Sequence, residues 1–215
     1  MLHTEVVERT TLELLKRLQQ EEPLQAFCLA GGTSLALYLG HRISVDLDLF
    51  TPESFDTRGL EKFLGDHYGF RTSFSASNTL KGSIENVKID CITHAYPYLV
   101  PPYQEEGVRL YGMEDIIAMK LSAIADDGSR MKDFIDIACL STRFSFASML
   151  GFYERKFPNA YVVRPLKALT YFEDIDQNEN VVMLKGRFSW KAIEKRLHDM
   201  AAHQEWVFEV MPVLG

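Results

Sequence analysis

The chain has 215 residues, 47% hydrophobic content and a formal net charge of -7, which describe an ordinary globular protein with enough apolar material for a sizeable core. The acidic balance argues against a broad nucleic-acid-binding surface but leaves room for a local basic patch. No apolar run approaches the roughly 18 residues of a membrane span, and the opening residues MLHTEVVERT lack the layout of a signal peptide. We therefore expect a cytoplasmic protein with no membrane partner. Three cysteines without CxxC spacing, each in an apolar context, predict buried reduced thiols: Cys28, Cys91 and Cys139.

The first elements lead to a glycine turn. Residues 4–20 have the apolar spacing of an amphipathic helix, and the short apolar run 24–30 predicts a buried strand. Gly31 and Gly32 follow, and then a helix to residue 39 that Thr33 or Ser34 caps and Gly40 closes. Backbone N–H groups at the start of a helix are where a phosphate binds.

Two aspartates share one face of the next strand, residues 45–50. The alternation places Val45, Leu47 and Leu49 on one face and Asp46 and Asp48 on the other. Carboxylates that close repel each other unless a positive charge lies between them, and a divalent cation with oxygen ligands is the usual solution. A phosphate-binding turn followed by metal-binding carboxylates indicates nucleotide chemistry.

The following segment contains a second strand with charged and apolar residues on opposite faces. Residues 56–68 are predicted to form a helix with Asp56 or Thr57 as N-cap, and residues 70–75 and 79–84 two strands. In the strand 87–92, Lys88 and Asp90 lie opposite the apolar face, so Asp90 is a third carboxylate on a strand. The proline-containing stretch that ends near residue 108 is interpreted as a linker to a helical half.

A lysine lies within the apolar stripe of the helix 113–126. Lys120 either extends its ammonium group past the end of the stripe into solvent or points into a cleft toward phosphates or carboxylates, because a buried unpaired charge is costly. In the next helix, residues 130–142, Asp133 and Asp136 lie on the polar side, which by pattern alone is a solvated face. Residues 143–172 are aromatic-rich, helical and broken at Pro158 and Pro165, and most of these rings are expected in the core.

A last helix is predicted from residue 189 to about residue 203. Positive charge gathers ahead of it and along it, at Lys185, Arg187, Lys191, Lys195 and Arg196. This pattern fits either a solvated helix face or an RNA contact, with the solvated face favoured.

The paired glycines and the Asp-x-Asp strand resemble the signature of the nucleotidyltransferase superfamily that includes DNA polymerase β. Together with Arg42-x-Ser44-x-Asp46-x-Asp48 and the Asp-rich helix downstream, the chain resembles the AbiEii/AbiGii toxin branch. The resemblance implies that the metal ligands, for Mg²⁺ or Mn²⁺, are Asp46, Asp48 and Asp90. Asp90 would bind the second metal or act as a base.

The same resemblance assigns further roles to other residues of this chain. Asp46, Asp48, Asp90, Lys120 and Asp136 would be catalytic. The NTP would contact Gly31, Gly32, Thr33, Ser34, Arg42, Ser44, Lys120 and Asp133. The fold expected is α+β, with a mixed sheet and flanking helices over residues 1–100 that carry the metal site. A helical domain over residues 101–215 would close the nucleotide cleft.

The expected activity is transfer of a nucleoside monophosphate from an NTP to an acceptor, with release of pyrophosphate. The favoured acceptor is tRNA or another RNA, and the favoured setting is a toxin–antitoxin system with a winged-helix antitoxin. Two alternatives remain open: transfer to a small molecule such as an aminoglycoside, which an acidic surface would suit, and a nucleotide-binding protein without turnover.

Overall fold

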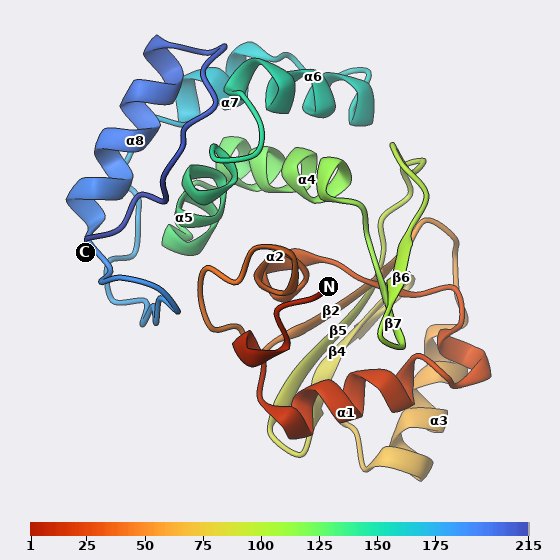
Figure 1. Ribbon diagram of the computed structural model, residues 1–215. Coiled ribbons are helices and arrows are strands. Elements are labelled where there is room, and N and C mark those ends of the chain that lie inside the picture. The colour runs from red at the N-terminus through yellow and green to blue at the C-terminus, as the bar shows by residue number, and fades with distance from the viewer. Residues whose placement is uncertain (215) are drawn as a thin grey trace. The chain divides into compact units, whose positions relative to one another are not determined.

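A seven-stranded mixed sheet forms the centre of the first of two compact units (Figure 1). The computed structural model describes residues 1–214. Unit 1 comprises residues 1–40 and 44–112, and unit 2 comprises residues 41–43 and the chain from residue 113 onward. The three-residue loop 41–43 thus belongs to unit 2, although the segments on both sides of it belong to unit 1.

The strand order in unit 1 is β3-β4-β5-β2-β1-β7-β6. Two pairs, β2 with β5 and β1 with β7, are parallel, and the other neighbours are antiparallel. Leu47, Leu49 and Cys91 are fully buried on these central strands, so the core of the unit lies there. The strands are β1 Cys28–Leu29, β2 Leu47–Thr51, β3 Arg71–Ala76, β4 Thr79–Ile84, β5 Val87–Thr93, β6 Tyr103–Glu105 and β7 Val108–Leu110.

The first elements of unit 1 differ from the predicted ones in two places. The predicted helix 4–20 is divided into a 3-10 turn, η1 Thr4–Val6, and α1 Arg9–Leu18. Of the predicted strand 24–30, only β1 is formed. Its predicted first residue belongs instead to a second 3-10 turn, η2 Glu22–Leu24. The helix α3 Thr57–Tyr68 begins as predicted, with Asp56 accepting a hydrogen bond from the Gly59 N–H at 3.1 Å.

The interpretation of the proline-containing stretch as a linker is wrong for its second half. Residues 103–110 form the hairpin of β6 and β7, and Leu110 of β7 pairs with Leu29 of β1. Val108 and Leu110 are fully buried, so the two apolar positions of a three-residue strand suffice to add this hairpin to the sheet. Unit 1 therefore extends to Gly112, rather than ending near residue 100.

Unit 2 is helical. Its elements are α4 Met113–Asp126, α5 Met131–Leu140, α6 Phe146–Lys156, α7 Val163–Ala168 and α8 Trp190–Ala202. α4 packs against α5, α6 and α7, and α5 also packs against α8. Pro165 lies in the first turn of α7 instead of breaking a helix, because a proline there removes no intrahelical hydrogen bond.

The three cysteines are buried and free, as predicted. Burial raises the pKa of the Cys91 and Cys139 thiols to about 12. Across residues 1–214, no helix combines the length and apolar character needed to cross a membrane.

Candidate active site

Gly31 brings the backbone of the glycine turn against the Asp-x-Asp strand. Its φ is +65°, in the left-handed region, and a Cβ built on it would lie 2.0 Å from Oδ2 of Asp48. Only glycine permits this approach. The nine-residue helix α2, Gly31–Leu39, begins at this point, so its unpaired N–H groups and the carboxylate of Asp48 lie at the same end of the sheet.

Thr33 and Ser44 fix the loop between α2 and β2. The Thr33 hydroxyl donates to the backbone oxygen of Asp46 at 2.5 Å. Since that donation uses its one proton, the 2.8 Å contact between Thr33 Oγ1 and Ser44 Oγ has Ser44 as the donor.

The predicted capping role of Thr33 or Ser34 is wrong, since α2 starts at Gly31 with Ala30 as N-cap. Thr33 and Ser34 lie inside the first turn, and both are buried. Their predicted contacts with a nucleotide remain predictions.

The two aspartates of the acidic strand differ in exposure. Asp46 precedes β2 and is exposed, whereas Asp48 lies within the strand and is half-buried. Val45, predicted on the buried face, is instead 50% exposed because the strand begins only at Leu47.

Asp90 is buried, with 5% of its surface exposed, and it is the register partner of Asp48 on the adjacent parallel strand. Register partners in a sheet have their side chains on the same face, with strands about 4.8 Å apart. Lys81 Nζ lies 3.3 Å and Lys88 Nζ 3.6 Å from Asp90 Oδ2. Asp90 Oδ1 has no hydrogen-bond partner among the described residues.

Asp46, Asp48 and Asp90 are suited to a divalent cation by chemistry, because hard cations take carboxylate oxygens. Oδ1 of Asp90, which no group of residues 1–214 hydrogen-bonds, and the close approach of Gly31 to Asp48 fit such a site. As the side chains stand in residues 1–214, however, no three His, Cys, Asp or Glu residues are gathered to hold a metal ion.

A second group of predicted site residues forms a buried charge cluster in unit 2. Oδ1 of Asp136 accepts hydrogen bonds from Nε of Arg42 at 2.7 Å and from Nε2 of His41 at 2.8 Å. Oδ2 of Asp136 accepts from Nη2 of Arg42 at 2.9 Å and lies 2.8 Å from the Lys120 ammonium. That ammonium also donates to Asp133 Oδ1 at 2.5 Å. Two cations thus face two carboxylates, and all these side chains are at most 5% exposed.

The pattern-based interpretation of Asp133 and Asp136 as a solvated face is wrong. Both are buried, because the face of α5 that carries them packs toward Lys120 of α4. Burial by itself opposes ionisation of Asp136, but Arg42 and Lys120 outweigh it and hold the pKa of that carboxyl well below its usual range. Lys120 likewise keeps a raised pKa despite its burial, because Asp133 and Asp136 flank it.

His41 is a member of the cluster that was not predicted from the sequence. Since ionised Asp136 only accepts hydrogen bonds, Nε2 of His41 carries the proton, and Nδ1 has no hydrogen-bond partner in the described part of the chain. Burial lowers the pKa of His41, so this histidine is neutral in the folded protein. Its position next to Arg42 was the available signal, but six histidines dispersed along the chain gave no reason to select it.

The lowered pKa of His41 predicts a loss of stability in mild acid. Below its ordinary pKa of 6.5 the unfolded state takes up a proton that the folded state does not. The free energy of unfolding should therefore fall by about 1 kcal/mol between pH 7.5 and 5.5. The measurement is urea unfolding at both pH values. His41→Gln keeps a donor for Asp136 without titrating, so it should reduce this dependence, and an unchanged pH dependence in that variant would contradict the assignment.

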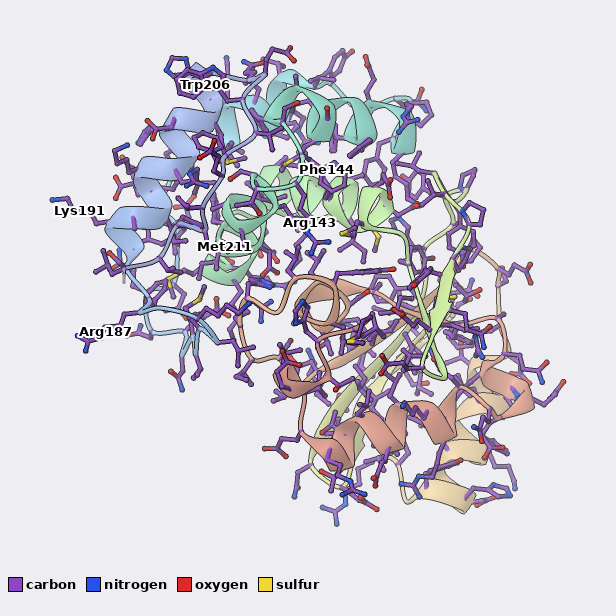
Figure 2. All side chains as sticks on the ribbon, in the orientation of Figure 1. Arg143, Phe144, Arg187, Lys191, Trp206 and Met211 are labelled. Carbon is purple, nitrogen blue, oxygen red and sulfur yellow. The ribbon has the colours of Figure 1, made fainter. Side chains whose placement is uncertain are left out.

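The basic residues near the last helix are only partly available. Arg196 is buried and donates to Ser141 Oγ and to the Val210 carbonyl oxygen, and Lys195 pairs with Asp199. Lys185, Arg187 and Lys191 are exposed, and Figure 2 shows Arg187 and Lys191 extending outward from unit 2.

Comparison with known proteins identifies the family of this chain. Residues 13–214 match the family model described as "Nucleotidyl transferase AbiEii toxin, Type IV TA system". An uncharacterized protein of Aquifex aeolicus is 33% identical over 154 residues, which are 69% of this chain and 74% of that protein.

Two solved structures share the fold. The nucleotidyltransferase toxin MenT4 of Mycobacterium tuberculosis is 14% identical, with a TM-score of 0.60 over 90% of this chain and 81% of MenT4. JHP933 of Helicobacter pylori is 18% identical, with a TM-score of 0.50 over 91% and 92% of the two chains.

Proposed function

Because the chain belongs to the AbiEii nucleotidyltransferase toxin family, we propose that it moves a nucleoside monophosphate from an NTP to an RNA acceptor, with tRNA as the favoured one. The observation that carries the proposal is the approach of Gly31 to Asp48. It sets the start of α2 against a strand face that presents Asp48 and Asp90 in register, with Asp46 two residues before Asp48. A phosphate-binding turn and a carboxylate face are the two parts that this transfer needs.

Asp46 and Asp48 would hold Mg²⁺ or Mn²⁺, and Asp90 would bind a second ion or take the proton of the acceptor hydroxyl. Bound there, the metal would lower the pKa of the acceptor and neutralise charge on the phosphates. Backbone N–H groups from Gly31 onward would hold triphosphate oxygens at the positive end of the α2 dipole. The buried thiols and the neutral His41 need no role in this chemistry.

The charge cluster of unit 2 would hold the loop 41–43 in a fixed conformation. Arg42 donates both hydrogen bonds of a bidentate pair to Asp136, and the loop also pairs with residues 182–184 through Ile43 N to Val182 O (2.9 Å) and Leu184 N to His41 O (2.9 Å). Ser44 follows this loop directly in the sequence, and Asp46 comes two residues later. Direct contact of Arg42, Lys120 or Asp133 with the nucleotide would require these groups to exchange partners.

RNA as acceptor is supported by the exposed cations Lys185, Arg187 and Lys191, which are available to phosphates. The family description supports an antitoxin partner, and a winged-helix protein encoded beside this gene is the form we propose. NTPs and tRNA are both present in the cytoplasm, which is the compartment we propose. The net charge of -7 favours the second candidate, a cationic small-molecule acceptor.

The acceptor can be tested by supplying each α-labelled NTP with Mg²⁺ or Mn²⁺ and either total tRNA or a panel of aminoglycosides. Label on tRNA with one preferred nucleotide supports the RNA proposal. Label on an aminoglycoside alone would replace it with the small-molecule candidate. Metal-dependent NTP binding without product on either acceptor would contradict both.

A further inference from the structure

Three charged residues lie in line across neighbouring strands of unit 1. Asp90 of β5 is the register partner of Asp48 on β2 and of Lys81 on β4. Register partners lie on the same face of a sheet, so this face presents a lysine, a buried aspartate and a half-buried aspartate in a row. Lys88, two residues before Asp90 on β5, lies on the same face.

The two oxygens of Asp90 have different surroundings. Oδ2 lies 3.3 Å from the ammonium of Lys81 and 3.6 Å from that of Lys88, whereas Oδ1 has no hydrogen-bond partner within residues 1–214. The side chain of Asp90 is 6% exposed, against 40% for Lys81 and 58% for Lys88. A buried carboxylate is therefore balanced from one side by two lysines whose side chains extend into solvent.

Such an arrangement allows another cation to replace the two lysines beside Asp90. A buried carboxylate needs positive charge nearby, so Asp90 without these lysines would be costly. Ion pairs with partly exposed lysines at these distances are weak, and the long side chains can leave at small cost.

We propose that Lys81 and Lys88 hold Asp90 while no divalent cation is bound, and release it when a cation binds beside Asp48. Both lysines are positioning residues, because they act through Asp90. The inference rests on the metal site of the proposed function.

The test is Mn²⁺ binding to the full chain without nucleotide, followed by the electron paramagnetic resonance signal of free Mn²⁺. Because the cation no longer competes with two ammonium groups, the double variant Lys81→Gln/Lys88→Gln should bind Mn²⁺ about five- to tenfold more tightly than the unaltered protein. Lys81→Arg/Lys88→Arg keeps both charges and should stay near the unaltered affinity. Lys62→Gln removes one positive charge from a surface pair with Asp66 on α3 and is the control for a charge lost away from Asp90.

The outcomes separate this inference from the proposed function. Equal Mn²⁺ affinity in the unaltered protein and the Gln double variant, with binding lost in Asp48→Asn, would overturn the role of the lysines and leave the metal site intact. Absence of Mn²⁺ binding in every variant would overturn both. Tighter binding in the Gln double variant alone, lost again when Asp48→Asn is added, supports the inference.

Discussion

Replacing Asp136 with alanine should destabilise unit 2 by about 3 to 5 kcal/mol, the range measured when one partner of a buried ion pair is removed. The change leaves Arg42 without its bidentate acceptor, His41 without an acceptor and Lys120 with Asp133 alone. All these groups are buried, so their charges and donors lose the carboxylate without exposure to bulk water. Urea unfolding followed by circular dichroism measures the loss.

Asp199→Ala on α8 is the matched control for this prediction. Asp199 pairs with Lys195 at 2.7 Å in an exposed pair four residues apart on a helix, and such pairs contribute little. The unfolding midpoint of the Asp199→Ala variant should stay close to that of the unaltered chain. Equal effects of the two substitutions would mean that the buried cluster does not stabilise unit 2.

Gly31→Ala should lower the transfer rate by about a hundredfold or more, since displacement of a catalytic group by about 1 Å can cost that much. An alanine Cβ would lie 2.0 Å from Asp48 Oδ2 and 2.9 Å from its Cγ, so the carboxylate has to move. The backbone conformation, with φ at +65°, is also unfavourable for alanine. Transfer of labelled nucleotide under single-turnover conditions measures the effect.

Gly65→Ala gives the matched control. Gly65 lies within α3, and its Cβ would meet nothing within 4 Å. Alanine there should leave transfer unchanged and raise the free energy of unfolding by about 0.5 to 1 kcal/mol through helix propensity. A Gly31→Ala variant that retains full transfer would show that the contact between the turn and Asp48 is not needed.

The long helices and regular strands were predictable because each carries a clear apolar period. The helix 113–126 agrees with α4 at both ends, and the strand 79–84 agrees with β4. The hairpin 103–110 was not predictable, because three-residue strands are too short to show a period and their pairing with β1 is distant in sequence. The fold class, α+β with a mixed sheet followed by helices, was correct.

The candidate site was predictable in its local parts only. The glycine turn and Asp48 are seventeen residues apart and form one local unit, so sequence spacing sufficed to link them. The pattern of α5 predicted a solvated face for Asp133 and Asp136, since a helical wheel cannot show that a polar face is buried by charge pairing. Only the family resemblance gave these two residues a role in the site of Lys120. The contact of Lys81 with Asp90 could likewise not be predicted, because it depends on strand register.

We propose that this chain transfers nucleotides through the carboxylate face that includes Asp48. The most direct measurement is the single-turnover rate of label transfer from an α-labelled NTP to tRNA by the unaltered chain, by Asp48→Asn and by Asp66→Asn. Asp48→Asn keeps the size of the side chain and removes its charge, whereas Asp66 is an exposed residue of α3. We predict transfer by the unaltered chain and by Asp66→Asn, and a loss of about a thousandfold or more in Asp48→Asn. Equal transfer by Asp48→Asn would contradict the account.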